Sequence, residues 1–375
     1  MDLPPLRLGR LTIDVPVVLA PMAGITNAAF RRLCREQGAG LYVCEMITSR
    51  GIVERDAKSL SMLAFDPLEP IRSVQLYGVD PRHVGDAVRI LAAEHGVHHV
   101  DLNFGCPVPK VTRRGGGAAL PWKRDLLAAI LVSAVAAGDE FGVPITIKTR
   151  KGIDDDHLTF LDAGRIAEQA GCAAIALHGR TAVQHYSGVA DWDSIATLKQ
   201  AVSIPVLGNG DIWCADDAHA MVEHAGVDGV VIGRGCLGRP WLFGDLGAAF
   251  RGAPTVTPPT LGQVAGVMRR HAVLLAELMG EERGLTDMRK HMAWYLKGFQ
   301  VGSEIRSALG QVSALAELDT LLGRLDPSQP YPRGELTAPR GRQGTPRRVV
   351  VPDGWLDDRG TADLAWEPPL AVSGG

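Results

Sequence analysis

The sequence predicts an α/β protein built on a (β/α)8 TIM barrel, followed by a C-terminal helical bundle and a disordered tail. Between about residues 15 and 250, apolar runs alternate with amphipathic helical stretches. The runs are continuously apolar, as parallel strands are when both of their faces are buried. Eight such β/α units in about 240 residues match the size of a barrel. A doubly wound open sheet is the alternative, but no Gly-x-Gly-x-x-Gly motif follows the first run.

The predicted elements follow one another in a regular order. The expected strands are 17–20, 41–45, 72–76, 98–104, 144–149, 174–177, 205–208 and 229–233. The expected helices are 27–37, 81–95, 124–137, 157–170, 192–201, 215–224 and 240–250, with a less regular helical pattern at 50–63. Because barrels carry their active sites at the carboxyl ends of the strands, the residues that end each run are the candidates for function.

Polar side chains interrupt the apolar runs almost always at this same end. Gln75 lies at the end of the third run, and Lys148 and Arg150 lie at the end of the fifth. His178 and Arg180 follow the sixth run. The sequence therefore predicts one site that contains these side chains. A lysine in solvent and a hydrogen-bonded structural histidine are the alternatives for Lys148 and His178.

Two glycine-rich loops follow the last two runs, at 208–211 and 233–235. Barrels bind phosphate at this position, where glycines let backbone N–H groups approach an anion and an arginine adds a bidentate donor. A tight turn is the alternative for either loop alone, but the pair predicts a phosphorylated ligand. The predicted contacts are Asn209, Gly210, Asp211, Gly233 and Arg234.

The run 98–104 stops abruptly at Gly105-Cys106-Pro107. Glycine permits a tight turn and proline fixes it, so the thiol of Cys106 is held just after a buried strand. Three glycines at 115–117 suit a loop that closes over a substrate. An unperturbed thiol has a pKa of ~8.5 and can donate a proton at neutral pH. A buried structural cysteine is the alternative.

The α/β pattern ends at a proline-rich linker near 252–259, and 261–325 is helical in pattern. Apolar residues recur at helical spacing over 264–278, and further helices are expected at 286–299, 303–309 and 312–322. Arg289 and Lys290 lie close to Trp294 and Tyr295, and interleaved basic and aromatic residues suit contacts with RNA. A solvated face over an aromatic core is an equal alternative. We therefore expect a catalytic domain at 1–252, a helical domain at 253–325, and a disordered, Pro/Gly/Arg-rich tail at 326–375 whose contact with RNA stays open.

Composition narrows the class of protein. The net charge is −3, although 254–351 carries 13 Lys and Arg against 9 Asp and Glu. The basic segment is where a polyanion would bind. Six cysteines show neither a CxxC pair nor zinc-site spacing, so we expect a reduced, cytoplasmic protein that binds no metal. No apolar run reaches the ~18 residues of a membrane span. As a separate expectation, we predict a monomer.

Taken together, the motifs resemble those of the tRNA-dihydrouridine synthases over about residues 10–325. The most specific is Asp-Leu-Asn-Phe-Gly-Cys-Pro at 101–107, and 289–298 resembles the bacterial B-type branch. The others lie at 20–26, 75–78, 147–150, 178–181, 208–211 and 233–241. Cys236 stands where small residues such as alanine are usual in the family, and we assign it no role.

The resemblance implies an FMN-dependent, NADPH-driven reduction of the C5=C6 bond of a specific uridine in tRNA to 5,6-dihydrouridine. Hydride would pass from flavin N5 to C6 and a proton from Cys106 to C5, with Lys148 stabilising the developing charge. The expected cofactor contacts are Pro21, Met22, Ala23, Gln75, Lys148, His178, Asn209, Gly210, Asp211, Gly233 and Arg234. The expected tRNA or uracil contacts are Asn103, Arg150, Arg180, Arg289 and Lys290.

Two other functions stay open from the sequence. A flavin-dependent TIM-barrel oxidoreductase that acts on a free pyrimidine or another small enone would share the glycine-rich loops and a catalytic thiol. A non-catalytic RNA-binding protein could retain an old barrel. The basic helical domain disfavours the first, and the presence of both Cys106 and Lys148 disfavours the second.

Overall fold

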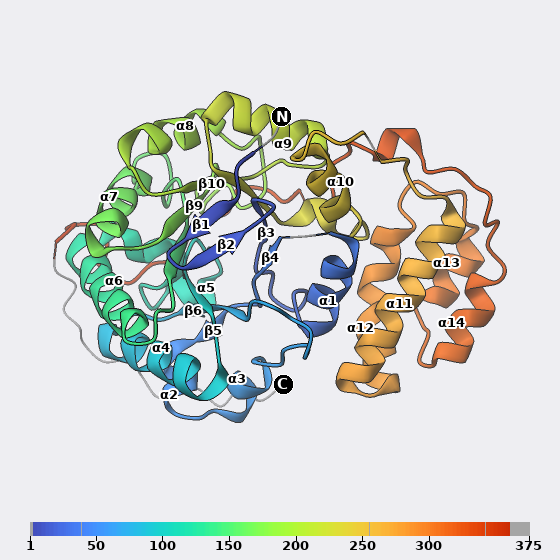
Figure 1. The fold of residues 1–375 in the computed structure, drawn as a ribbon, viewed down its shortest axis with the longest axis horizontal. Coiled ribbons are helices and arrows are strands. Elements are labelled where there is room, and N and C mark those ends of the chain that lie inside the picture. Colours follow the sequence, from blue (N-terminus) through green and yellow to red (C-terminus); the bar gives the residue numbers. More distant parts are fainter. Residues whose placement is uncertain (1–2, 39, 255, 342, 361–375) are drawn as a thin grey trace.

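The computed structural model describes residues 3–38, 40–254, 256–341 and 343–360. Parallel strands form a ring at its centre, and helices cover the outside of the ring (Figure 1). The strands are β3 (Val17–Leu19), β4 (Leu41–Tyr42), β5 (Ile47–Thr48), β6 (Ser73–Tyr77), β7 (His99–Phe104), β8 (Ile145–Arg150), β9 (Ala174–His178), β10 (Val206–Asn209) and β11 (Gly229–Ile232). The helices are α1 (Ala28–Gln37), α2 (Ser49–Val53), α3 (Ala57–Ser61), α4 (Pro81–His95), α5 (Pro109–Thr112), α6 (Arg124–Asp139), α7 (Phe160–Ala170), α8 (Trp192–Ala201), α9 (Ala215–Ala225) and α10 (Leu242–Ala249).

The ring closes as a barrel. Strand β3 pairs with β11 on one side and with β4 on the other. Both β4 and β5 lie beside β6, because Val43 bridges Ser73 and Ile47 pairs with Leu76. The second barrel strand is therefore interrupted, which divides the predicted run 41–45 and adds a short strand after it. The predicted (β/α)8 barrel is confirmed.

Local signals explain where the helices begin and end. Helix α4 begins at Pro81, and the side chain of Asp80 accepts a hydrogen bond from the backbone N–H of Arg82. Proline is favoured at the first helical position because its missing N–H is not needed there. The helix ends at Gly96, whose φ of 58° is the left-handed conformation that glycine adopts most easily. Such caps fix where each helix begins and ends, and therefore also the lengths of the loops that connect the helices to the strands of the barrel.

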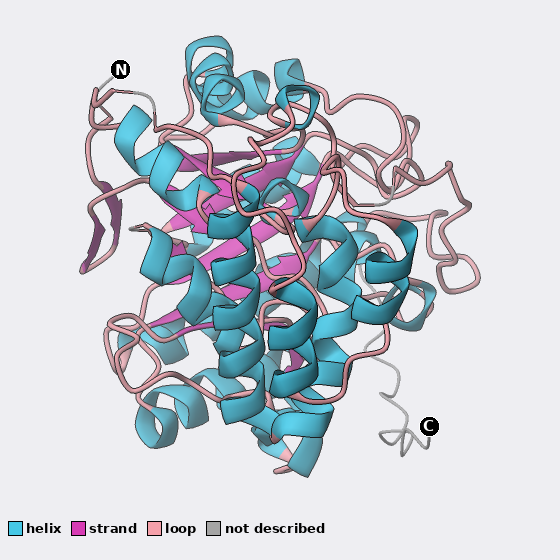
Figure 2. Ribbon diagram, turned by 90° about the vertical axis from the view of Figure 1, so that its right-hand side faces the viewer, coloured by secondary structure: helices cyan, strands magenta, loops and turns pink. Residues whose placement is uncertain are grey.

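A hairpin that the sequence analysis did not predict covers the amino-terminal end of the barrel. Strands β1 (Leu6–Leu8) and β2 (Leu11–Ile13) pair antiparallel. Leu8 and Ile13 are buried against barrel residues such as Leu41. Figure 2 shows this hairpin at one end of the sheet and the long loops at the other. The hairpin seals the end opposite the predicted site.

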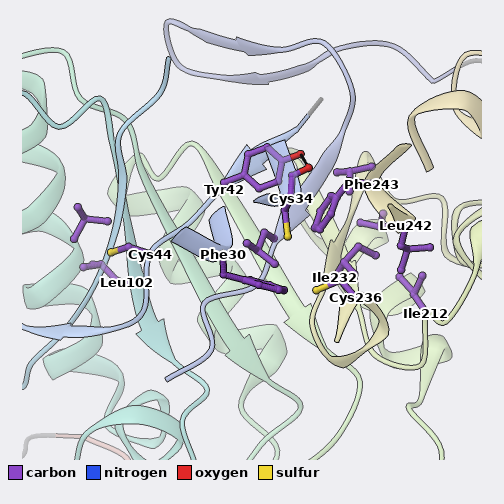
Figure 3. Close-up of a cluster of buried hydrophobic side chains, with 14 of the residues drawn as sticks. Phe30, Cys34, Tyr42, Cys44, Leu102, Ile212, Ile232, Cys236, Leu242 and Phe243 are labelled. Carbon is purple, nitrogen blue, oxygen red and sulfur yellow. Dashed lines mark hydrogen bonds between the residues drawn. The ribbon is translucent and has the colours of Figure 1, made fainter. Parts of the chain in front are cut away.

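Four further helices form the C-terminal bundle: α11 (Leu261–Met279), α12 (Glu281–Tyr295), α13 (Ser303–Leu309) and α14 (Leu315–Leu322). The bundle lies beside α1 (Figure 1). Phe30 of α1 joins the two parts, because its ring lies 5.4 Å from His271 and 5.8 Å from His291. Figure 3 shows Phe30 in the same buried cluster as Tyr42 and Phe243. The bundle and barrel thus share a core.

The buried histidine pair predicts that stability falls in mild acid. Burial lowers the pKa of His271 to about 3 and lowers that of His291 well below its ordinary value. Below about pH 6.5 the two histidines therefore bind protons in the unfolded chain but stay neutral in the folded chain. The free energy of unfolding decreases as the pH falls below this value. For His271 alone the loss by pH 5 is roughly 2 kcal/mol.

Urea unfolding at pH 7 and pH 5 tests this expectation. The His291→Leu variant should show a smaller difference in unfolding free energy between the two pH values than the wild type. Met288→Leu, at a buried residue of α12 that does not titrate, is the matched control and should keep the wild-type difference. Equal pH dependence in His291→Leu and the wild type would contradict the prediction.

The described part of the tail differs from the predicted disordered segment. Residues 331–341 and 343–360, which we call the strap, contact the loops after β11, β9 and β7 in turn. Buried side chains anchor it: Arg340 donates to the carbonyl of Leu237, and Val349 is buried beside the loop after β7. The buried apolar and arginine residues of the strap are isolated among prolines and show no helical or strand periodicity. The sequence alone therefore predicts disorder for this segment. The remainder of the predicted tail, 361–375, lies outside the described residues.

The described residues also bear on membranes and metals. In 3–38, 40–254, 256–341 and 343–360, no helix combines the length and apolar character needed to cross a membrane. The same ranges contain no group of three His, Cys, Asp or Glu side chains placed to bind a metal ion.

Candidate functional site

A cavity of about 400 Å³ opens at the carboxyl ends of the barrel strands. Its volume lies in the range of small-molecule and cofactor sites. It brings together most of the predicted site residues: Pro21, Met22, Ala23, Gln75, Asn103, Cys106, Lys148, Arg150, His178, Asn209, Gly210, Asp211, Gly233 and Arg234. Three other predicted residues, Arg180, Arg289 and Lys290, lie outside its lining.

The turn that carries Cys106 is held by two neighbouring side chains. The amide oxygen of Asn103 accepts hydrogen bonds from the backbone N–H groups of Gly105, at 3.1 Å, and Cys106, at 2.9 Å. Arg150 Nε donates to the carbonyl of Gly105 at 2.8 Å. Burial raises the pKa of the Cys106 thiol above its ordinary value. The site therefore presents a protonated thiol at neutral pH, at a fixed place on the cavity wall.

A buried polar network lies beneath this turn. Asn103 Nδ2 donates to Gln75 Oε1, and Gln75 Nε2 donates to Asp101 Oδ2, both at 2.7 Å. Thr146 Oγ1 donates to the other oxygen of Asp101 at 2.7 Å. Burial raises the pKa of Asp101 to about 6. The network orients Gln75 and Asn103 toward the cavity, and Asp101 is a supporting residue that the sequence analysis did not select. Its signal was the period of two in His99, Asp101 and Asn103.

Lys148 extends from β8 into the cavity. Its Nζ donates to Asn209 Oδ1 at 3.0 Å, and Asn209 Nδ2 donates to the carbonyl of Val231 at 2.7 Å. Burial, with the positive charge of Arg150 nearby, lowers the pKa of Lys148 to about 8. An anion that entered the cavity would raise the pKa of Lys148 and so favour its charged form.

The phosphate-binding loops predicted after β10 and β11 follow two paired strands, and both line the cavity. The guanidinium carbon of Arg234 lies 4.2 Å from the ring centre of Tyr186 and 5.1 Å from that of Trp213. Asp211 lies 3.9 Å from Arg234. Burial, together with neighbouring cations, lowers the pKa of His178 well below its ordinary value. The cavity lining contains Lys148, Arg150 and Arg234 but, among carboxylates, Asp211 alone, and a bound phosphate would balance this excess of positive charge. Tyr186 and Trp213 were not predicted, because neither belongs to a strand-end motif.

Arg150 and Arg180 are buried, with 4% and 1% of their surfaces exposed. Arg150 also donates to the carbonyls of Thr181 and His185. Arg180 donates to the carbonyls of Ser187 and Gly188 and, at 2.8 Å, to Asp211 Oδ2. Asp211 adopts a φ of 57°, unusual for a residue other than glycine, so this ion pair helps to hold the loop after β10. The contacts of both arginines with RNA stay predictions; Arg150 lines the cavity, and Arg180 lies outside its lining.

Of the two residues predicted to contact tRNA, Arg289 forms hydrogen bonds within the bundle and Lys290 connects the bundle to the barrel. Arg289 donates to the carbonyls of Gln311 and Val312 at 2.9 Å each. Lys290 Nζ donates to the carbonyl of Gly24, at 2.5 Å, in the loop after β3. Trp294, one turn further along α12, lines the cavity itself. The bundle therefore contributes to the wall of the site.

Comparison with known structures supports the barrel. Histamine dehydrogenase from Rhizobium sp. 4-9 superposes with a TM-score of 0.52 at 10% sequence identity, over 87% of this chain and 65% of that chain. An identity this low supports the fold alone.

Relatives with higher identity cover nearly the whole chain. A probable tRNA-dihydrouridine synthase of Mycobacterium tuberculosis is 58% identical over 363 residues, which cover 95% of this chain and 93% of the relative. That of Mycobacterium leprae is 54% identical, over 96% of this chain and 100% of the relative. The tRNA-dihydrouridine synthase B of Pseudomonas aeruginosa is 39% identical, over 82% of this chain and 91% of the relative. The family model described as dihydrouridine synthase (Dus) matches residues 18–326. The chain therefore belongs to the dihydrouridine synthase family.

Proposed function

We propose that this protein reduces the C5=C6 bond of a uridine in tRNA to 5,6-dihydrouridine, with FMN as cofactor and NADPH as reductant. The observation that carries the proposal is that Cys106 and Lys148 line one ligand-sized cavity together with the two glycine-rich loops. Family membership supports the proposal, as does the tRNA-dihydrouridine synthase name of the relatives.

The charge of the cavity fits the phosphate of FMN. Arg234 and the loops 209–211 and 233–235 would hold the phosphate and ribityl groups, where buried cations outnumber carboxylates. Pro21, Met22 and Ala23 would line the ring, with Gln75 and His178 as polar contacts. When bound and reduced, the flavin supplies the hydride that adds to C6.

The residues of the chain supply the rest of the reaction. Hydride addition at C6 moves negative charge toward the O4 oxygen of the uracil, because the double bond is conjugated with that carbonyl. Lys148 would stabilise this charge. Cys106 would donate its proton to C5, and solvent would later reprotonate the thiolate. Hydride and proton together add two hydrogens to the base, so the reaction balances.

The substrate must present a single exposed base, because a stacked uracil offers no face to the cofactor. We propose that the bundle, 253–325, binds the tRNA while the barrel, 1–252, performs the chemistry. Trp294 at the cavity wall is suited to stack on a base beside the target. We further propose that the enzyme acts in the cytoplasm as a monomer.

Mass analysis of nucleosides tests the function. Unmodified tRNA would be incubated with the protein, FMN and NADPH, then digested and sequenced by mass spectrometry. The expected result is a gain of two hydrogens at one uridine. NADPH consumption with unchanged tRNA, and activity on a free pyrimidine or other small enone, would instead establish a small-molecule reductase.

Arg234→Ala is expected to weaken retention of FMN, because it removes the bidentate donor from the proposed phosphate site. Loss of a charged hydrogen-bond partner of this kind costs roughly 1.5–3 kcal/mol, which corresponds to a ~10- to 100-fold higher dissociation constant. Flavin fluorescence titration of the apoprotein measures it. The matched control is Arg269→Ala, which removes an exposed arginine of α11 that pairs with Asp319. Equal FMN affinity in Arg234→Ala and wild type would contradict the phosphate assignment.

A further inference from the structure

The strap, residues 331–341 and 343–360, lies beyond the end of the family match at residue 326. It leaves the bundle beside α12, where Arg340 donates to the carbonyl of Trp294 at 2.7 Å. Gly341 then lines the cavity. The backbone N–H of Arg347 donates to the carbonyl of Val183, after β9, at 2.9 Å. The strap therefore follows the rim of the cavity and ends beside the loop after β7, which carries Cys106.

Trp355 contacts that loop at two points. Its indole Nε1 donates to the carbonyl of Ala119 at 2.9 Å. Its ring lies against Gly115, where an added Cβ would overlap the indole. Gly115 also adopts a φ of 74°, so the residue needs to be glycine for both reasons. In this structure Gly115, the first residue of the triple glycine that the sequence predicts as a closing loop, contacts the strap.

The contacted segment is hydrogen-bonded to the backbone of Cys106. The backbone N–H of Ala118 donates to the carbonyl of Cys106 at 3.0 Å, one residue from the carbonyl that Trp355 binds. A Cβ at Gly117 would also clash with this same carbonyl of Cys106. Val349 of the strap is buried in one cluster with Ala118. The position of Cys106 thus depends on a segment that the strap covers.

Further contacts hold the far end of the segment. Lys123 Nζ donates to the carbonyl of Asp358 at 2.7 Å, and the N–H of Arg124 donates to the carbonyl of Arg359 at 3.0 Å. The guanidinium of Arg359 lies 3.9 Å from the ring centre of Trp122. A glycine-rich segment has high conformational entropy when nothing contacts it. Such contacts therefore restrict its conformations more than they would restrict those of a segment without glycine.

We propose that the strap, through Trp355, holds the Cys106 loop in the geometry that proton donation requires, and that Trp355 is a positioning residue for the reaction. The importance of that geometry rests on the proposed function of Cys106. The positioning itself concerns only the contacts of the strap, so it can be tested without the reaction. Since these anchors lie outside the region matched by the family model, the device is additional to the barrel and bundle.

The test measures alkylation of Cys106 by iodoacetamide in the holoenzyme, followed residue by residue with mass spectrometry. Cys214 is the internal reference, since it is also partly exposed and lies at the start of α9. In Trp355→Ala the Cys106 rate is expected to change by about 10-fold or more, and kcat for tRNA to fall by a similar factor at unchanged FMN occupancy. Trp355→Phe keeps a ring but loses the N–H donor, so its effect should be intermediate. Arg348→Ala, at an exposed strap residue, should leave the Cys106 rate unchanged.

The outcomes separate the two hypotheses. An unchanged Cys106 rate in Trp355→Ala would overturn the positioning role, whatever the activity. Equal changes at Cys106 and Cys214 would also overturn it, because they would indicate general loosening of the fold. A wild-type protein that binds FMN but leaves every tRNA unchanged would reject the proposed function, while a selective change at Cys106 would still support the positioning.

Discussion

Cys106→Ala is expected to lower the rate of dihydrouridine formation by roughly 10²- to 10⁴-fold, the range in which positioned general acids contribute. The thiol lies on the cavity wall, on a turn whose backbone is held by Asn103 and Arg150, and burial keeps the thiol protonated at neutral pH. Its removal should leave the cation-rich phosphate site intact. The variant should therefore stay yellow and accept electrons from NADPH while failing to transfer them to tRNA at the normal rate.

A single-turnover experiment measures this step alone. The reduced enzyme is mixed with unmodified tRNA, and flavin reoxidation is followed by absorbance under anaerobic conditions. Cys214→Ser is the matched control, because serine also suits the first position of a helix and Cys214 lies outside the cavity lining. Normal reoxidation by Cys106→Ala would remove this residue as the proton donor.

Lys148→Met is expected to slow the same step by roughly 10²- to 10³-fold, the cost of removing one preorganised donor from a developing oxyanion. Its Nζ lies inside the cavity, 3.0 Å from Asn209, and methionine retains much of the side-chain volume without the charge. Lys199→Met, at a lysine of α8 that pairs with Asp228, is the matched control and should keep normal turnover. Unchanged single-turnover rates in Lys148→Met would exclude a role in charge stabilisation.

The pH dependence gives a second test of the lysine. Burial lowers the pKa of Lys148 to about 8, so its positive charge is present below that pH and lost above it. The single-turnover rate of the wild type should therefore fall as pH rises through about 8. Lys148→Arg keeps a charge at all working pH values, so its residual activity should persist to higher pH. A wild-type profile that stays flat to well above pH 8 would contradict the loss of the Lys148 charge near that pH.

The structure presents the candidate site as the product of three parts of the chain. The barrel supplies Cys106, Lys148 and the glycine-rich loops, and the bundle supplies Trp294. The strap supplies Gly341 to the lining and contacts the Cys106 loop. A substitution far along the chain, in the bundle or strap, can therefore change the chemistry as well as the binding of tRNA.

Much of this arrangement could be predicted from the sequence because its causes are local. Continuous apolar runs mark strands buried on both faces, and caps such as Asp80 and Gly96 mark the helix ends. Parallel strands bring their carboxyl ends to one face. The polar residues that end the runs, including Cys106 and Lys148, were therefore predicted to meet, and all of them except Arg180 line one cavity.

Only the tertiary structure decided which charges face a ligand and which serve the protein. Arg150 and Arg180 occupy strand-end positions like that of Lys148, yet both are buried on backbone carbonyls. Tyr186 and Trp213 stack on Arg234, although nothing in their neighbourhoods in the chain marks them. Trp355 reaches the Cys106 loop across 236 positions of the sequence. Sequence patterns record how a residue relates to its neighbours along the chain. The contacts of a buried guanidinium, or of an indole far away in the sequence, depend on surfaces that form only when the barrel closes.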